Sequence, residues 1–147
     1  MTGSAEMKLV FRLAGIGFSL PVNLLVEIVE LEERPRKSTG DDASPWAQVT
    51  FRGEDVPLID IAQNFGLSAP LEGSSMTMLV LHGELGHWGA LVHAVEGIRS
   101  KGEFEERVLS PLFSLGGGNL YDTIDYWRDE PLIQFEPERF APAGDAT

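Results

Sequence analysis

The strongest constraint on the fold is a pair of segments in which apolar and polar residues alternate on both sides of a glycine-containing turn. The first segment, KLVFRLAGIGFSLPV, covers residues 8–22 and turns at Ala14-Gly15; the second, SMTMLVLHGELGHWGALVHAV, covers residues 75–95. Alternation with a period of two is typical of half-buried β-strands, and glycine permits the tight turn of a hairpin. Two such hairpins predict a mainly β protein with two lobes, in which one face of each strand is buried.

A third hairpin is predicted within FRGEDVPLID, residues 51–60. Gly53 tolerates the positive φ of a tight turn, so Arg52 and Gly53 are expected to connect two strands. Pro57 has no N–H to donate to a ladder, so its strand should lie at a sheet edge or carry a bulge there. The charged turn is therefore interpreted first as a structural element.

Two short helical segments are also predicted. Apolar residues have helical spacing over residues 22–29, but Pro21 precedes them and the β-branched sequence VEIVEL follows, which indicates one helical turn that leads into a strand. Asp60 stands before IAQNF, and Gly66 follows it. This order predicts a short helix whose first turn is capped by the carboxylate of Asp60.

Composition limits the classes of function. The chain has 147 residues, enough for one domain, and its 43% hydrophobic and 23% charged residues are typical of a globular protein. It contains no cysteine, which excludes disulfides and thiolate metal sites, and its formal net charge of −12 makes nucleic acid an unexpected partner. No apolar run approaches the length of a membrane span, and the first residues do not resemble a secretory signal. We therefore expect a cytoplasmic protein without direct membrane insertion.

No arrangement of reactive side chains predicts catalysis. The histidines at positions 82, 87 and 93 lack the helical spacing of a zinc protease, and His93 is interpreted as a hydrogen-bonded strand residue. Asp122 and Asp125 are close enough in sequence to suggest acid/base chemistry, but such a pair is more often part of a solvated acidic face. We expect no catalytic residue, no cofactor and no metal site.

The assembled pattern resembles the CheW-like domain, an adaptor family of bacterial chemosensory arrays. The matching segments are LVFRLAGIGFSLPVNLLVEIVEL, VTFRGEDVPLIDIAQNFGL, GALVHAVEGI and PLIQFEPERF. The resemblance implies two intertwined five-stranded SH3-like β-barrel lobes with short helical turns, packed through a hydrophobic junction. It implies a single domain over residues 8–140, with flexible tails at 1–7 and 141–147. It also implies binding to the regulatory domain of a CheA-type histidine kinase and to the cytoplasmic tip of a chemoreceptor, without catalysis.

The resemblance places the Arg-Gly hairpin in the lobe that meets partners. In the preceding strand, three of four successive positions are apolar, which is more than one half-buried face needs; the excess predicts an exposed apolar centre with Glu27 and Glu30 at its rim. The family pattern has Gly-Val before the hairpin where this chain has Ala-Gln. The predicted partner-binding residues are Val26, Ile28, Val29, Glu30, Gln48, Arg52 and Gly53.

Two roles remain open for Arg52, because its guanidinium can contact a partner or hold a neighbouring loop of its own chain. The function also has alternatives. The leading hypothesis is a non-enzymatic adaptor that couples chemoreceptors to a kinase in chemotaxis or related signalling. The second is a divergent CheW-like scaffold of another assembly, for example in twitching motility. A small-ligand-binding module or enzyme that uses a cleft between the lobes is the third.

Overall fold

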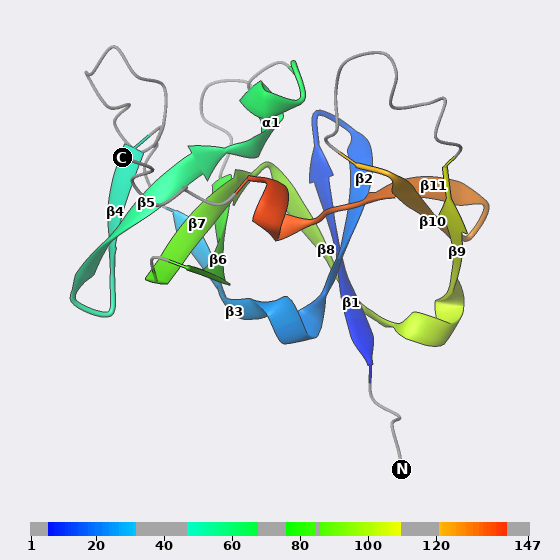
Figure 1. The fold of residues 1–147 in the computed structure, drawn as a ribbon, viewed down its shortest axis with the longest axis horizontal. Coiled ribbons are helices and arrows are strands. Elements are labelled where there is room, and N and C mark those ends of the chain that lie inside the picture. Colours follow the sequence, from blue (N-terminus) through cyan, green and yellow to red (C-terminus); the bar gives the residue numbers. More distant parts are fainter. Residues whose placement is uncertain (1–5, 32–46, 68–75, 85, 110–120, 141–147) are drawn as a thin grey trace.

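The computed structural model describes residues 6–31, 47–67, 76–84, 86–109 and 121–140. The expected tail at 141–147 lies outside the described residues, as does the greater part of the tail at 1–7. The described chain forms two curled β-sheets that lie side by side (Figure 1). The predicted mainly β fold with two lobes is confirmed.

Lobe 1 is built on a six-stranded sheet with the strand order β8-β1-β2-β11-β10-β9, one strand more than the five expected for each lobe. Its strands are β1 (Met7–Leu13), β2 (Ile16–Pro21), β8 (Ala94–Ser100), β9 (Phe104–Val108), β10 (Thr123–Trp127) and β11 (Glu130–Gln134). All neighbours are antiparallel except β2 and β11, which are parallel. The first and last parts of the chain therefore share one sheet.

Lobe 2 is built on a five-stranded sheet with the strand order β3-β6-β7-β5-β4. Its strands are β3 (Leu25–Leu31), β4 (Ala47–Phe51), β5 (Glu54–Asp60), β6 (Met76–Gly83) and β7 (Gly86–Val92). Only β5 and β7 are parallel. The chain passes from lobe 1 to lobe 2 after β2 and returns after β7, so the two lobes are intertwined.

The three predicted hairpins β1–β2, β4–β5 and β6–β7 are confirmed, and β10–β11 is a fourth. Three of these hairpins turn through two residues that both have positive φ: Ala14-Gly15, Arg52-Gly53 and Arg128-Asp129. Positive φ at both turn positions is the geometry of a type I′ turn, whose twist matches the right-handed twist of the flanking strands.

The helices within the described residues are all short: η1 (Val22–Leu24), α1 (Ile61–Asn64), η2 (Lys101–Glu103) and η4 (Pro137–Arg139). The predicted helical turn before β3 is confirmed by η1, and Asp60 occupies the predicted N-cap position of α1. The predicted capping bond is wrong, because the Asp60 side chain caps no N–H of α1 and its Oδ1 is buried without a partner among the described residues. None of the described helices has the length and apolar character needed to cross a membrane.

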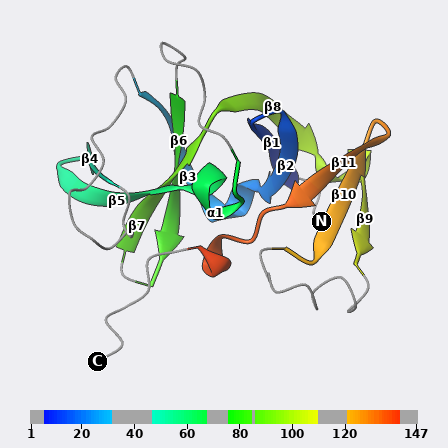
Figure 2. The same cartoon turned by 90° about the horizontal axis from the view of Figure 1, so that it is seen from above.

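The main core lies between the two sheets rather than inside either lobe. It joins Leu9, Phe11 and Phe18 of lobe 1 to residues of β5, β6 and β7, and the C-terminal residues around η4 close it. Figures 1 and 2 both show η4 lying between the sheets. Phe135 and Phe140, on either side of η4, stack with ring centroids 5.1 Å apart.

The expectation that each strand buries one face is wrong for β1 and β6. In β1, Leu9 and Phe11 face the junction between the lobes, whereas Val10 is buried in the interior of lobe 1. In β6, Leu79 and Met78 divide in the same way between the junction and the interior of lobe 2. A strand that separates a lobe interior from the junction has both faces covered, so alternation of polar and apolar residues is suppressed.

The interior of lobe 1 contains a buried ion pair. Lys8 is 5% exposed and Asp125 is fully buried, and the Lys8 Nζ lies 2.6 Å from Oδ2 of Asp125. The buried Ser19 hydroxyl donates to the same oxygen over 2.7 Å. The interpretation of Asp125 as part of a solvated acidic face is therefore wrong, although it holds for the exposed Asp122.

Candidate functional site

The β4–β5 turn presents a charged side chain that is also bound to its own chain. Arg52 has a φ of 51°, in the left-handed region that a residue with a Cβ adopts at some cost, and Gly53 follows with a φ of 82°. The Arg52 Nη2 donates to Oε1 of Glu27 over 2.7 Å, and the guanidinium lies 4.8 Å from the ring centroid of Phe51. The Arg52 side chain remains 62% exposed. Of the two roles left open for Arg52, the contact within its own chain is therefore observed.

The ion pair between Glu27 and Arg52 joins the two edges of the lobe 2 sheet, since β3 and the β4–β5 hairpin lie at opposite ends of the strand order. Glu27 can reach Arg52 because it pairs with Val80, a residue that faces the interior of lobe 2. Glu27 was assigned to the rim of an exposed patch; it lies instead on the face of β3 that is directed toward this interior. The ion pair therefore closes the curled sheet at one end.

Val26 and Val29 pack against the core of lobe 2 and are partly buried. Val26 packs on this core because the β3–β6 ladder has a register shift between Leu25 and Glu27. The shift moves Val26 out of the regular alternation of side chains between the two faces of the strand. Neither valine contributes a fully exposed surface. The expected exposed centre made of three apolar residues is therefore smaller than the sequence indicated.

Ile28 and Glu30 are exposed and lie on the same face of β3, opposite to Glu27. Ile28 is 36% exposed, although its partner across the ladder, Leu79, is buried in the junction between the lobes. The exposed side of Ile28 therefore lies at the margin of the main core. It offers a small apolar surface with a carboxylate beside it.

Gln48 is exposed on β4 and pairs across the ladder with Pro57. It shares the outward face of the strand with Thr50, while Val49 and Phe51 pack against the interior of lobe 2. The structure thus brings Arg52 and Gly53 to β3 through Glu27, and it places Gln48 on the outer side of the same hairpin.

Each of the three histidines contacts another residue of the described chain. His93 Nδ1 accepts a hydrogen bond from the N–H of Ala14 over 2.8 Å, which confirms the interpretation of His93 as a hydrogen-bonded residue. His82 and His87 face each other across the β6–β7 ladder, with ring centroids 5.0 Å apart. In the part of the chain that the structure describes, no three potential ligands are grouped as a metal ion requires.

The pairing of Glu27 with Arg52 was missed by the sequence analysis, although both residues were named. The two lie 25 positions apart, on strands that are not neighbours in the sheet. No local pattern links them. Only the curl of the sheet brings them together.

Comparison with known proteins identifies the fold. The family model of the CheW-like domain matches residues 8–117. Among solved structures, the scaffolding protein TtCheW from Thermoanaerobacter tengcongensis superimposes with a TM-score of 0.75 and 17% identity, and the match covers 98% of each chain. No match was found among curated protein sequences.

Proposed function

The chain belongs to the CheW-like domain family, and from this premise we propose that it couples a CheA-type histidine kinase to chemoreceptors. The CheW-like scaffold fold indicates a chemotaxis-type adaptor, and the family is one of non-catalytic scaffold proteins. The partners proposed are the regulatory domain of the kinase and the cytoplasmic tip of the receptor. The proposed contact residues are those of β3 and the Arg-Gly hairpin: Val26, Ile28, Val29, Glu30, Gln48, Arg52 and Gly53.

One observation supports this surface most: an exposed arginine is held in a defined position by an acidic residue of its own lobe. Glu27 takes a hydrogen bond from one terminal nitrogen of Arg52. A guanidinium has five N–H donors, so donors remain for a carboxylate or a backbone carbonyl of a partner. Arg52 can therefore serve as an internal brace and as a contact at the same time. Holding the side chain in advance lowers the entropy lost when it binds.

Ile28 supplies the apolar part of the surface. We expect Ile28→Asp to lower affinity for the kinase regulatory domain at least tenfold, because a truncated apolar contact at the centre of an interface costs about 2 kcal/mol or more. Ile98→Asp is the matched control, since Ile98 is a 40% exposed strand residue in lobe 1. Isothermal titration with the regulatory domain of the cognate kinase measures both variants, and equal losses for the two would contradict the proposed surface.

A charge swap separates the two roles of Arg52. Arg52→Glu places two carboxylates together and should abolish binding. The double variant Glu27→Arg with Arg52→Glu restores the internal ion pair but reverses the charge shown to a partner. If Arg52 contacts the partner, the double variant folds with a restored melting temperature and still does not bind. Recovery of full binding in the double variant would show that Arg52 only holds Glu27 and does not contact the partner.

A separate titration with a peptide of the receptor tip tests the second partner. Normal kinase binding combined with no receptor binding would assign the chain to another scaffold of the same family.

A further inference from the structure

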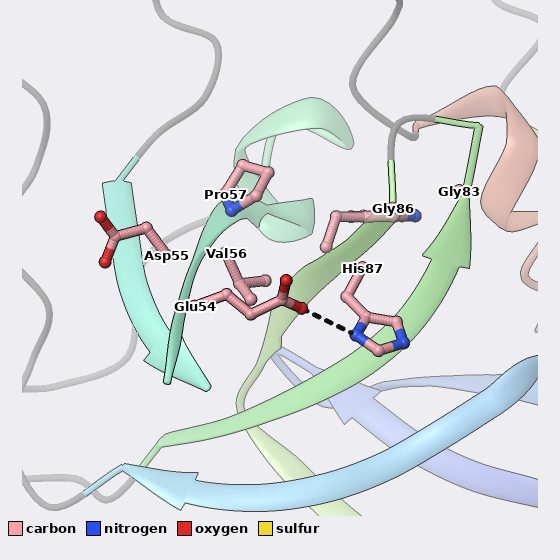
Figure 3. A pocket seen from close by; sticks show the side chains of 8 residues that line it. Glu54, Asp55, Val56, Pro57, Gly83, Gly86 and His87 are labelled. Carbon is pink, nitrogen blue, oxygen red and sulfur yellow. Dashed lines mark ion pairs between the residues drawn. The ribbon is translucent and has the colours of Figure 1, made fainter. Parts of the chain in front are cut away.

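A cavity of about 220 Å³ lies in lobe 2 where β5 and β7 diverge. These parallel strands pair only over residues 58–60 and 89–91, so residues 54–57 and 86–88 face each other without a ladder between them. The cavity is lined by Glu54, Asp55, Val56 and Pro57 of β5, by Gly83 of β6, and by Gly86, His87 and Trp88 of β7 (Figure 3).

The size of the cavity indicates what it can hold. Sites for small molecules and cofactors generally measure about 300–1,000 Å³. A volume of about 220 Å³ is smaller, and it suits a single long side chain better than a complete cofactor.

The lining of the cavity combines polar and apolar residues, and its mouth is acidic. Val56 and Trp88 are already covered, at 1% exposed each, whereas the half-buried Pro57 offers apolar surface to a chain of methylene groups. The Glu54 side chain is 64% exposed, and its Oε1 lies 3.5 Å from Nδ1 of His87. A dashed line marks this ion pair in Figure 3. A carboxylate with two oxygens keeps acceptor sites for a further donor.

Gly83 and Gly86 contribute no side chains to the hairpin end of the cavity. A Cβ on Gly83 would lie 2.9 Å from the Trp88 ring, and Gly86 has a φ of 115° that disfavours other residues. The cavity therefore opens beside the turn of the β6–β7 hairpin.

We propose that this cavity binds one arginine or lysine side chain that projects from an extended segment of a protein partner. The methylene stem packs against Pro57, and the cationic group pairs with Glu54. The backbone of residues 54–57, which has no ladder partner on the side of β7, offers hydrogen-bonding groups to the extended segment. The formal net charge of −12 favours a basic segment over an acidic one. This site is additional to the surface proposed above, and its test requires neither kinase nor receptor.

The test is a nuclear magnetic resonance titration of the full chain with the capped peptide acetyl-Thr-Val-Arg-Val-Thr-amide. The matched peptide has norleucine in place of arginine and lacks only the charged group. We expect amide shifts at residues 54–56 and 86–88 with the arginine peptide. We also expect the norleucine peptide to bind about tenfold more weakly, a factor that corresponds to about 1.4 kcal/mol.

A pair of variants assigns the charge contact. Glu54→Gln should weaken binding of the arginine peptide about tenfold. Glu105→Gln is the control, because Glu105 lies on β9 of lobe 1, does not line the cavity, and has a side chain 65% exposed against 64% for Glu54. Circular dichroism checks that both variants fold. Shifts confined to another surface, equal binding of the two peptides, an unchanged affinity in Glu54→Gln, or no binding at all would each overturn the proposal.

Discussion

Replacing Lys8 by methionine should destabilise the protein strongly, because it leaves Asp125 as an unpaired buried charge. Lys8 and Asp125 are 5% and 0% exposed, and their charged atoms are 2.6 Å apart. Ser19 donates to the same carboxylate oxygen, but a hydroxyl brings no compensating charge. Removing one partner of a buried ion pair costs about 3–5 kcal/mol. Domains are commonly stable by about 5–15 kcal/mol in total, so this loss is a large fraction.

The double variant Lys8→Met with Asp125→Leu should recover most of this loss. It removes both charges and places apolar side chains beside the cluster of Val10, Trp127 and Leu132. Replacement of a buried ion pair by apolar residues of similar volume is often neutral or stabilising by about 1–4 kcal/mol. The double variant should therefore be more stable than Lys8→Met alone.

Urea unfolding followed by circular dichroism measures all three proteins, with the slope of the transition used to confirm that the extent of unfolding is unchanged. Thermal melts provide a second reading, since about 1 kcal/mol corresponds to a shift of about 2–4 °C for a chain near this size. A Lys8→Met variant as stable as the wild type would refute the reasoning, because the Asp125 carboxylate would then not depend on Lys8. A double variant as unstable as the single one would show that the site cannot be repacked.

Three further outcomes are expected. Gly89→Ala should cost about 1–3 kcal/mol in urea melts, because the added Cβ would overlap a buried methionine side chain, whereas Gly102→Ala in open space should change stability by less than about 0.5 kcal/mol; equal effects would argue against the tight packing. The hydrogen bond from Arg12 lowers the pKa of Glu130, so this pair contributes stability above the ordinary pKa of a glutamate, and the contribution is lost as the pH falls through the lowered pKa. Glu130→Gln should therefore be less stable than wild type by at most about 1 kcal/mol at pH 7, with the difference vanishing in acid, and a difference that grows in acid would contradict the assignment. Asp60→Ala should be neutral or slightly stabilising in the same melts, because its side chain makes no capping bond; a loss above about 1 kcal/mol would restore the capping role.

The elements of this fold could be predicted because their signals are local. Both the Ala14-Gly15 and the Arg52-Gly53 turn contain a glycine, which tolerates positive φ, and the residues that flank Arg52-Gly53 alternate with the period of a strand. The helical turn before β3 followed from Pro21 and the β-branched residues behind it. Each of these features depends on a few neighbouring residues, so the sequence alone specified them.

The candidate site could be predicted only in part. Arg52 and Ile28 were identified from the turn and from the excess of apolar residues, and both are exposed. Val29 directly follows Ile28, so the alternation of the strand places it on the opposite face. Val26 packs on the lobe interior because of the register shift at the start of β3, which depends on the pairing with β6 and has no local signal.

The sequence by itself determined the strands and turns of three hairpins, the strand that follows the first helical turn, and the family to which the chain belongs. The tertiary structure alone decided which charges are paired and which faces are covered. Lys8 meets Asp125 across 117 positions, and Glu27 meets Arg52 across 25, because the order and curl of the strands bring them together. The reason is physical: turn and strand preferences act over a few residues, whereas the burial of a charge depends on everything that packs around it in three dimensions.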